Sequence, residues 1–224
     1  MVKEFVEQLE KLVENATNIV IVGHFNPDGD SVGSVTGMRS YLEMKGKNPK
    51  VLLPSKYPDF LSFLDADCDY QIFTQNPELV TESIGNAELI LCLDFNNLGR
   101  TEGLKELISS SSATKVLIDH HPSPEVESFD LVCSTVETSS TCELLFYVLM
   151  ESASISNDVQ KMPYKCAEAL ATGMLTDTNN FKNSAIASTY RMASLLLERG
   201  VSLDDLGKRV FGSYSESRMR LMGE

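Results

Sequence analysis

The chain has 224 residues, of which 42% are hydrophobic and 23% charged, and its formal net charge at pH 7 is −13. This composition is too apolar for a disordered chain, and no apolar run reaches the roughly 18 residues that a transmembrane helix needs. The acidic excess argues against a general polyanion-binding protein and makes phosphate binding unfavourable unless cations are added. We therefore expect a soluble globular protein without a membrane partner.

The first segment and the cysteines indicate the compartment. Residues 1–17 interleave apolar side chains with glutamates at the spacing of an amphipathic helix, which excludes a signal peptide. Five cysteines contain no CxxC pair and lie mostly in apolar segments, so we predict reduced thiols and a cytoplasmic location. They are Cys68, Cys92, Cys133, Cys142 and Cys166.

Apolar strands alternate with helices along the rest of the chain. The pattern predicts strands at 19–22, 50–53, 88–93, 115–118 and 131–133. It predicts helices at 31–45, 58–64, 77–84, 101–109, 140–149, 164–175, 184–199 and 203–211, with a capping box at Ser140–Glu143. Strands that are apolar throughout and alternate with helices indicate an α/β fold, with a doubly wound, mainly parallel sheet and helices on both faces.

The segment from residue 24 to residue 30 carries the strongest chemical signal. If its backbone is extended, as Pro27 favours for the residue before it, the polar side chains at alternate positions project from one face. One imidazole and two carboxylates there suit a divalent cation of the Mn or Zn type. Taken alone, the segment is explained equally well as a polar turn. The four side chains are His24, Asn26, Asp28 and Asp30.

Further acids and imidazoles follow predicted strands later in the chain. Asp94 follows one strand directly, and Asp119, His120 and His121 follow the next. In open α/β sheets, this edge is where ligands bind. Asp177 comes after an apolar helix. A lone acid after a strand is usually a helix cap, but all three histidines of the chain lie at strand ends beside acids.

Convergence of these acids would require added positive charge. Four carboxylates, those of Asp28, Asp30, Asp94 and Asp177, cannot all stay ionised within a few ångströms without compensation. Two divalent cations would supply it. Metals roughly 3.5–4 Å apart form the usual clamp for phosphoester hydrolysis, in which a bridging hydroxide attacks.

These motifs resemble those of the DHH phosphoesterase family. The resemblance implies a manganese-dependent phosphodiesterase or phosphatase, with Mg²⁺ as the alternative cation. The stretch Asn-Pro-Asp-Gly-Asp is more similar to the nanoRNase and pAp-phosphatase branch than to class II pyrophosphatases, which implies short oligonucleotides, pAp or similar small nucleotides as substrates. The matching motifs are His-x-Asn-Pro-Asp-Gly-Asp-Ser-x-Gly-Ser at 24–34, Asp94, Asp119-His120-His121 and Thr176-Asp177-Thr178.

The resemblance also implies a role for each residue. Two Mn²⁺ ions are expected, one on His24, Asp28 and Asp94, and the other on Asp30, Asp94, His120 and Asp177.

Three residues outside these ligand sets are expected to be catalytic. Asp119 would orient a histidine, as metal-bound imidazoles generally require. His121 would contact the scissile phosphate as a hydrogen-bond donor or as an acid for the leaving group. Arg100 would clamp a phosphate, although a solvated arginine at a helix start explains it nearly as well.

The chain departs from the family pattern in three ways. Asn179 replaces the glycine that typically follows Thr-Asp-Thr, and asparagine tolerates a left-handed backbone. Lys182 stands where an arginine is common. No segment resembles the glycine-rich DHHA1 domain, so we expect a DHH catalytic domain at 1–200 and, at 201–224, a helical connector toward a missing C-terminal domain. We count a homodimer among the expected assemblies.

Three other interpretations deserve comparison. Residues 29–33 fit the GxSxG pattern of serine hydrolases, but a loop separates Ser31 from the preceding strand. An EF-hand beginning at Asn26 would place Ser31 where glycine is required and Gly37 where glutamate is required. The alternative that stays open is a non-catalytic nucleotide-binding sensor domain on the same fold.

Overall fold

The structure of the chain, a computed structural model, describes residues 2–65 and 69–212. Cys68 and residues 213–224 of the predicted connector lie outside the described residues. The division into a catalytic domain at 1–200 and a connector at 201–224 therefore stays a prediction.

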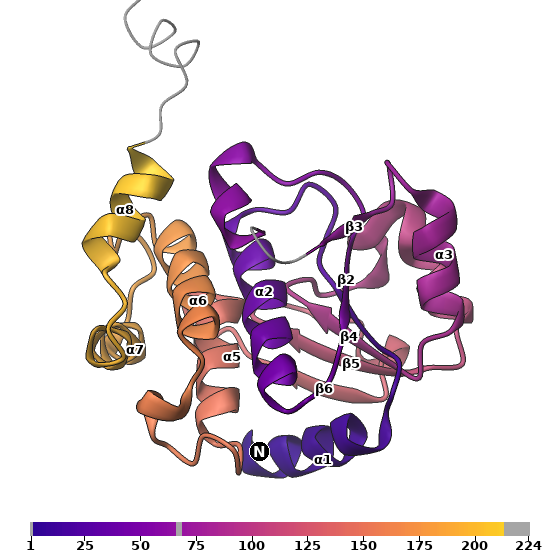
Figure 1. Cartoon of the computed structure of the whole chain (residues 1–224), viewed down its shortest axis with the longest axis horizontal. Helices are drawn as coiled ribbons and strands as arrows, with labels where there is room; N and C mark the ends of the chain where they lie inside the picture. Colours follow the sequence, from indigo (N-terminus) through magenta and orange to yellow (C-terminus); the bar gives the residue numbers. More distant parts are fainter. Residues whose placement is uncertain (1, 66–68, 213–224) are drawn as a thin grey trace, which may run out of the picture.

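A parallel sheet forms the centre of the molecule (Figure 1). In the described part of the chain it has six strands in the order β3-β2-β1-β4-β5-β6, and every pairing is parallel. All residues of the central strands β1 and β4 are buried, as expected for a sheet covered on both faces. The strands are β1 (Ile19–Val22), β2 (Lys50–Leu53), β3 (Gln71–Ile72), β4 (Leu89–Leu93), β5 (Thr114–Asp119) and β6 (Leu131–Ser134).

Helices cover both faces of this sheet, which confirms the predicted doubly wound α/β fold (Figure 1). None of those described combines the length and apolar character that crossing a membrane requires. The core on one face includes side chains of α1 (Val2–Asn15), α2 (Gly29–Met44), α5 (Thr141–Met150), α6 (Tyr164–Asp177), α7 (Ala187–Glu198) and α8 (Leu203–Phe211). The other face is covered by α3 (Pro77–Gly85), the 3₁₀ helix η2 (Leu98–Leu104) and α4 (Lys105–Ser110). Shorter 3₁₀ helices are η1 (Asp59–Leu64), η3 (Val126–Ser128) and η4 (Val159–Lys161).

Some elements of the structure differ from the prediction. Strand β3 was not predicted, because two residues are too few to show a periodic pattern. The helix predicted at 101–109 is wrong in its first half, since η2 is interrupted at Glu102, whose φ is 44°. The helix predicted at 184–199 begins only at Ala187, after Ser184 with a φ of 55°.

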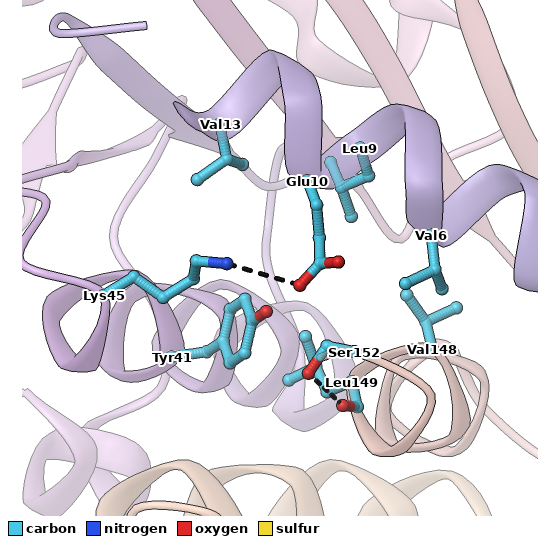
Figure 2. A pocket seen from close by; sticks show the side chains of 9 residues that line it. All are labelled: Val6, Leu9, Glu10, Val13, Tyr41, Lys45, Val148, Leu149 and Ser152. Atoms are coloured by element: carbon cyan, nitrogen blue, oxygen red, sulfur yellow. Dashed lines mark hydrogen bonds and ion pairs between the residues drawn. The ribbon is translucent and has the colours of Figure 1, made fainter. Parts of the chain in front are cut away.

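Helix α1 is fixed against α2 and α5 by an apolar contact that encloses an ion pair (Figure 2). Glu10 Oε1 lies 3.3 Å from Lys45 Nζ, and it accepts a hydrogen bond of 3.2 Å from the backbone N of Ala153. Val6 and Tyr41 line the same contact. The gap that remains measures about 10 Å³, which is at most enough for one water molecule. This contact therefore serves to pack α1 against α2 and α5, and it leaves no room for a ligand.

Glycines bring α2 and α6 into close contact. A Cβ atom at Gly33 would lie 2.6 Å from the carbonyl oxygen of Ala169, and one at Gly173 would lie 2.9 Å from Asp30 Oδ1. No side chain larger than hydrogen fits at either position without moving a helix. The close approach matters for the site, because Asp30 lies at the start of α2 and Asp177 at the end of α6.

We predict that Gly33→Ala lowers the free energy of unfolding by about 1–3 kcal/mol, the usual cost of overpacking a tight contact. Gly207→Ala is the matched control, because a Cβ at Gly207 in α8 meets nothing within 4 Å. The control should be stabilised by about 0.5–1 kcal/mol, since alanine favours a helix interior over glycine. Urea denaturation measures both. Equal stability of the two variants would contradict the tight α2–α6 contact.

Candidate metal centre

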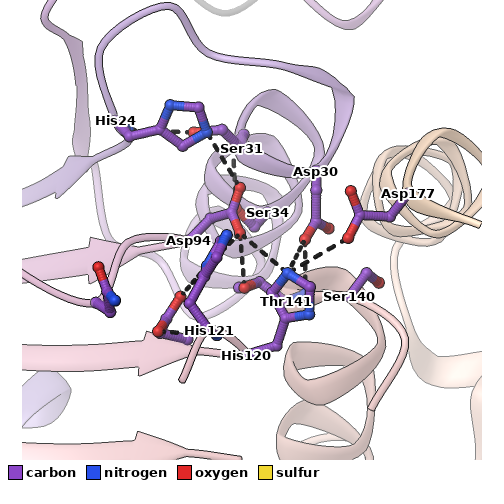
Figure 3. Close-up of polar contacts among 12 residues, drawn as sticks. His24, Asp30, Ser31, Ser34, Asp94, His120, His121, Ser140, Thr141 and Asp177 are labelled. Carbon is purple, nitrogen blue, oxygen red and sulfur yellow. Dashed lines mark hydrogen bonds and ion pairs between the residues drawn. The ribbon is translucent and has the colours of Figure 1, made fainter. Parts of the chain in front are cut away.

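The acids and imidazoles singled out in the sequence meet at the carboxyl ends of β1 and β4. These strands are neighbours at the middle of the sheet, where the strand order changes direction. Ligands of open α/β sheets bind at this point. Figure 3 shows side chains from α2, from α6 and from the segments that follow β1, β4 and β5 directed toward one another there, among them His24, Asp30, Asp94, His120 and Asp177.

The first cluster joins His24, Asp28 and Asp94. His24 Nε2 lies 3.4 Å from Asp94 Oδ2 and 3.8 Å from Asp28 Oδ1. The other ring nitrogen, Nδ1, lies 2.8 Å from the carbonyl oxygen of Phe25. A proton on Nδ1 donates to that oxygen and leaves Nε2 free to bind a metal. One ligand atom from each of the three side chains lies within 4.8 Å of the others.

The second cluster joins Asp30, His120 and Asp177. His120 Nε2 lies 3.3 Å from Asp177 Oδ2 and 3.8 Å from Asp30 Oδ2. The same nitrogen lies 3.9 Å from Asp94 Oδ1. Asp94 thus presents one carboxylate oxygen to each cluster, and it can bind two cations at once.

The electrostatics of these clusters favour a divalent cation. Burial raises the pKa of Asp94 to about 6. Burial, together with the charges of Asp30 and Asp28, raises the pKa of Asp177 to about 8. Burial and the neighbouring Asp94 also raise the pKa of Asp30 well above its usual value. Burial alone would lower the pKa of His24, but the carboxylates of Asp28 and Asp94 raise it to about 10. The site thus holds more carboxylate charge than its own groups neutralise.

The N-terminus of α5 holds two of these carboxylates. The backbone N of Thr141 donates to Asp30 Oδ2 at 2.6 Å, and the backbone N of Cys142 donates to Asp30 Oδ1 at 2.9 Å. The hydroxyl of Thr141 donates to Asp94 Oδ1 at 2.9 Å. Free N–H groups and the helix dipole stabilise anions at this end of a helix. Thr141 was not predicted as part of the site, because the sequence of its segment showed only the signal of a helix cap.

The predicted capping box at the start of α5 is only half formed. Ser140 caps the helix as predicted, but the Glu143 side chain has other partners than the Ser140 backbone. Ser140 Oγ accepts from the backbone N of Glu143 at 3.0 Å. The fully buried carboxylate of Glu143 does not bond the Ser140 backbone as a capping box requires. Its Oε2 accepts from the backbone N of Ser139 at 3.0 Å and from Thr189 Oγ1 at 2.7 Å. Glu143 therefore ties the start of α5 to the first turn of α7.

Asp119 orients His121. The fully buried Asp119 carboxylate lies 2.8 Å from His121 Nδ1 and accepts from the backbone N of His121 at 3.0 Å. His121 Nδ1 is also the atom that lies 3.9 Å from Asp94. Because Asp119 already occupies this nitrogen, we interpret His121 as a side chain that is held in a fixed orientation beside the two clusters, and not as a further metal ligand. Its role toward a phosphate stays a prediction.

The extended arrangement expected for residues 24–30 is wrong. Asn26 has a left-handed backbone with a φ of 51°, its side chain is exposed, and its backbone N donates to Ser55 Oγ at 2.8 Å. Asp28 caps α2 by accepting from the backbone N of Asp30 and of Ser31. Helix α2 thus begins at Gly29, two residues earlier than predicted, and the acids converge through the helix start.

Other positions bear on the remaining predictions. Asn179 has a φ of 45°, which confirms the expected left-handed turn after Asp177.

The serine-hydrolase interpretation does not fit the position of Ser31. Ser31 is fully buried inside α2, where its Oγ accepts from the backbone N of His24, whereas a nucleophile elbow needs an exposed serine at a sharp turn. Arg100 is exposed in η2, and its carbonyl oxygen accepts from the backbone N of Phe25 at 2.8 Å. Its use as a phosphate clamp stays a prediction.

Comparison with known proteins places this geometry in context. Residues 18–174 match the sequence model described as "DHH family, N-terminal domain". Over 201 residues the chain is 29% identical to the cyclic-di-AMP phosphodiesterase PdeA of Listeria monocytogenes, covering 87% of this chain and 30% of that protein. Over 200 residues it is 28% identical to the bifunctional oligoribonuclease and PAP phosphatase NrnA of Mycoplasma genitalium, covering 87% and 58%.

Solved structures agree with this similarity. An exopolyphosphatase-related protein from Bacteroides fragilis superposes with a TM-score of 0.92 at 36% identity, covering 98% of this chain and 64% of that one. Exonuclease RecJ bound to manganese shares the fold, with a TM-score of 0.59 at 15% identity, covering 93% of this chain and 55% of that one. The chain spans less than two thirds of the length of each of these four proteins.

We predict that Thr141→Val weakens Mn²⁺ binding by about 10- to 100-fold, because the hydroxyl that fixes Asp94 is lost while the side-chain shape is kept. Thr81→Val is the matched control, since the Thr81 hydroxyl donates only to the carbonyl oxygen of Pro77 in exposed α3. Titration calorimetry with Mn²⁺ measures both. Unchanged affinity in Thr141→Val would show that this hydrogen bond does not position the metal ligands.

Proposed function

The chain belongs to the DHH family through its N-terminal domain, and on that premise we propose that it is a manganese-dependent phosphoesterase that hydrolyses short oligonucleotides or pAp. The observation that carries this proposal is the position of Asp94. Its buried carboxylate belongs to the cluster with His24 and Asp28, at 3.4 Å from His24 Nε2, and its other oxygen faces the second cluster, at 3.9 Å from His120 Nε2. A carboxylate shared in this way is the central element of a two-metal hydrolytic site.

We assign the ligands of the two ions from these clusters. One Mn²⁺ is proposed on His24, Asp28 and Asp94, and the other on Asp30, Asp94, His120 and Asp177. Two observations favour manganese over magnesium. Imidazole ligands suit transition metals, whereas Mg²⁺ favours oxygen ligands and bound water. The RecJ structure, which shares this fold, is described as bound to manganese.

Side chains around the proposed ions would orient the proton donor and bind the phosphate. When bound, two divalent cations supply positive charge to the phosphate oxygens and lower the pKa of water. Asp119 holds the His121 ring through Nδ1, so that Nε2 of the doubly protonated ring is directed to donate a hydrogen bond or a proton to the leaving oxygen. Arg100 is proposed to clamp a phosphate, because its backbone is bonded to the loop that carries His24.

The relatives and the charge of the chain support the proposed substrate class. The NrnA relatives are described as oligoribonucleases and PAP phosphatases, and PdeA as a cyclic-di-AMP phosphodiesterase. A short nucleotide suits a chain of net charge −13, since two cations can hold one phosphate without a long basic track. The free thiols of the described cysteines agree with a cytoplasmic location. A homodimer remains part of the proposal.

We predict that the chain hydrolyses 5′-pApA or pAp with Mn²⁺ and that EDTA abolishes this turnover. His121→Asn should lower kcat by about 10²- to 10⁴-fold, because it removes a positioned proton donor, while the Mn²⁺ stoichiometry stays that of the unsubstituted chain. Chromatographic separation of the products and metal analysis measure the two effects. Tight binding of pApA to the manganese-loaded chain without any hydrolysis would instead support the sensor domain.

A further inference from the structure

The segment that follows Asp177 differs in composition from the rest of the chain. Residues 178–197 contain Lys182 and Arg191 and no acidic residue, although the net charge of the chain is −13. Within this segment Lys182, Ile186, Tyr190 and Arg191 are all exposed. We refer to residues 178–191 as the aromatic strip. Cationic and aromatic side chains exposed together are the surface with which proteins bind single-stranded nucleotides.

The aromatic strip presents a stacked pair of rings. The ring centroids of Phe181 and Tyr190 lie 5.4 Å apart, with an angle of 17° between the planes. Phe181 is half-buried and packs against the hydrophobic core, whereas Tyr190 is 55% exposed. Phe181 therefore supports one face of the Tyr190 ring from below and leaves the ring open to solvent. This geometry matches a platform for a flat ring from outside the protein.

Two connections place this pair beside the metal centre. Phe181 lies four residues after Asp177 in a compact turn, closed by a hydrogen bond of 2.9 Å from the backbone N of Asn183 to the carbonyl oxygen of Thr178. Tyr190 directly follows Thr189, whose hydroxyl donates to Glu143 at the start of α5. The same turn of α5 supplies the N–H groups that hold Asp30. Phe181 thus follows the helix that carries Asp177, and Tyr190 lies on α7, which is bonded to the turn of α5 that holds Asp30.

The backbone of the aromatic strip is strained where it carries Phe181. Asn179, Asn180 and Phe181 have consecutive positive φ values of 45°, 56° and 63°. Asparagine tolerates this region, but a bulky aromatic residue rarely adopts it. Strain of this kind persists where the surrounding structure enforces it, and it is concentrated at functional sites. The hydrogen bond of 3.1 Å from the backbone N of Phe181 to Thr178 Oγ1 helps to hold Phe181 in the position from which it supports Tyr190.

We infer that the exposed ring of Tyr190, backed by Phe181, stacks on a nucleobase of the substrate next to the phosphate held by the metals. This inference rests on the proposed function and specifies it, because it makes the base part of what the site recognises. Base–aromatic stacking accepts any base, so the site would favour nucleotides over base-free polyphosphates without selecting a sequence. Arg191, next to Tyr190, would supply positive charge for a neighbouring phosphate.

The test compares two probes on the manganese-loaded chain by titration calorimetry. One is a phosphorothioate-linked, 5′-phosphorylated adenine dinucleotide, and the other is imidodiphosphate, which has phosphates but no base. Tyr190→Leu keeps the apolar cover on Phe181 and removes the ring. It should weaken dinucleotide binding by about 5- to 100-fold and change imidodiphosphate binding less than twofold. Tyr190→Phe keeps the ring and should restore dinucleotide binding to within about threefold.

Tyr164→Leu is the matched control, because Tyr164 is also an exposed tyrosine, 44% accessible, but lies at the opposite end of α6 from Asp177. It should leave both affinities unchanged. Dinucleotide binding by Tyr190→Leu that equals the unsubstituted chain, while imidodiphosphate still binds, would overturn the inference and leave the metal centre standing. If the unsubstituted manganese-loaded chain binds neither probe, the proposed function fails, and the inference fails with it.

Discussion

The structure is organised around the burial of carboxylates at the carboxyl ends of β1 and β4. Burial raises the pKa of Asp30, Asp94 and Asp177, the charges of neighbouring carboxylates raise each pKa further, and the groups around the acids offset part of this cost. Two N–H groups and one hydroxyl at the start of α5 donate to them, and His24 and His120 lie between them. Divalent cations would supply the charge that these groups leave uncompensated.

The rest of the fold can be understood as the means of holding these acids together. The parallel sheet brings the ends of β1 and β4 side by side, which sets Asp94 next to His24. Glycines on α2 and α6 let the two helices approach, which brings Asp30 toward Asp177. Glu143 then fixes the start of α5 against α7. We therefore expect a change at the α2–α6 interface to alter both the stability of the fold and metal binding.

The site residues that directly follow an apolar strand could be predicted from the sequence. Asp94 and His120 could be predicted because each follows an apolar strand, and parallel strands end at one edge of a sheet. Asn26 was mispredicted, because its left-handed φ of 51° depends on a contact with Ser55, 29 residues away. Thr141 could not be predicted as part of the site, since it meets Asp30 across 111 positions of the chain. Contacts of that range depend on helix packing, which periodicity does not determine.

The relatives share the metal-binding domain but are described with different substrates, among them a cyclic dinucleotide, oligoribonucleotides and pAp. If the centre performs the same phosphoester chemistry in all of them, the choice of substrate must depend on groups outside it. In the described part of this chain, the aromatic strip is the group we infer to have this role, because it directly follows Asp177 and presents a stacked pair of rings.

The most direct test of this account is the number of Mn²⁺ ions bound by the chain and by Asp94→Ala, determined by titration calorimetry together with metal analysis. The account predicts two ions per chain and a strong loss of affinity for both in the variant, since one carboxylate faces both clusters. Binding of no ion, or of one ion whose affinity is indifferent to Asp94, would contradict it.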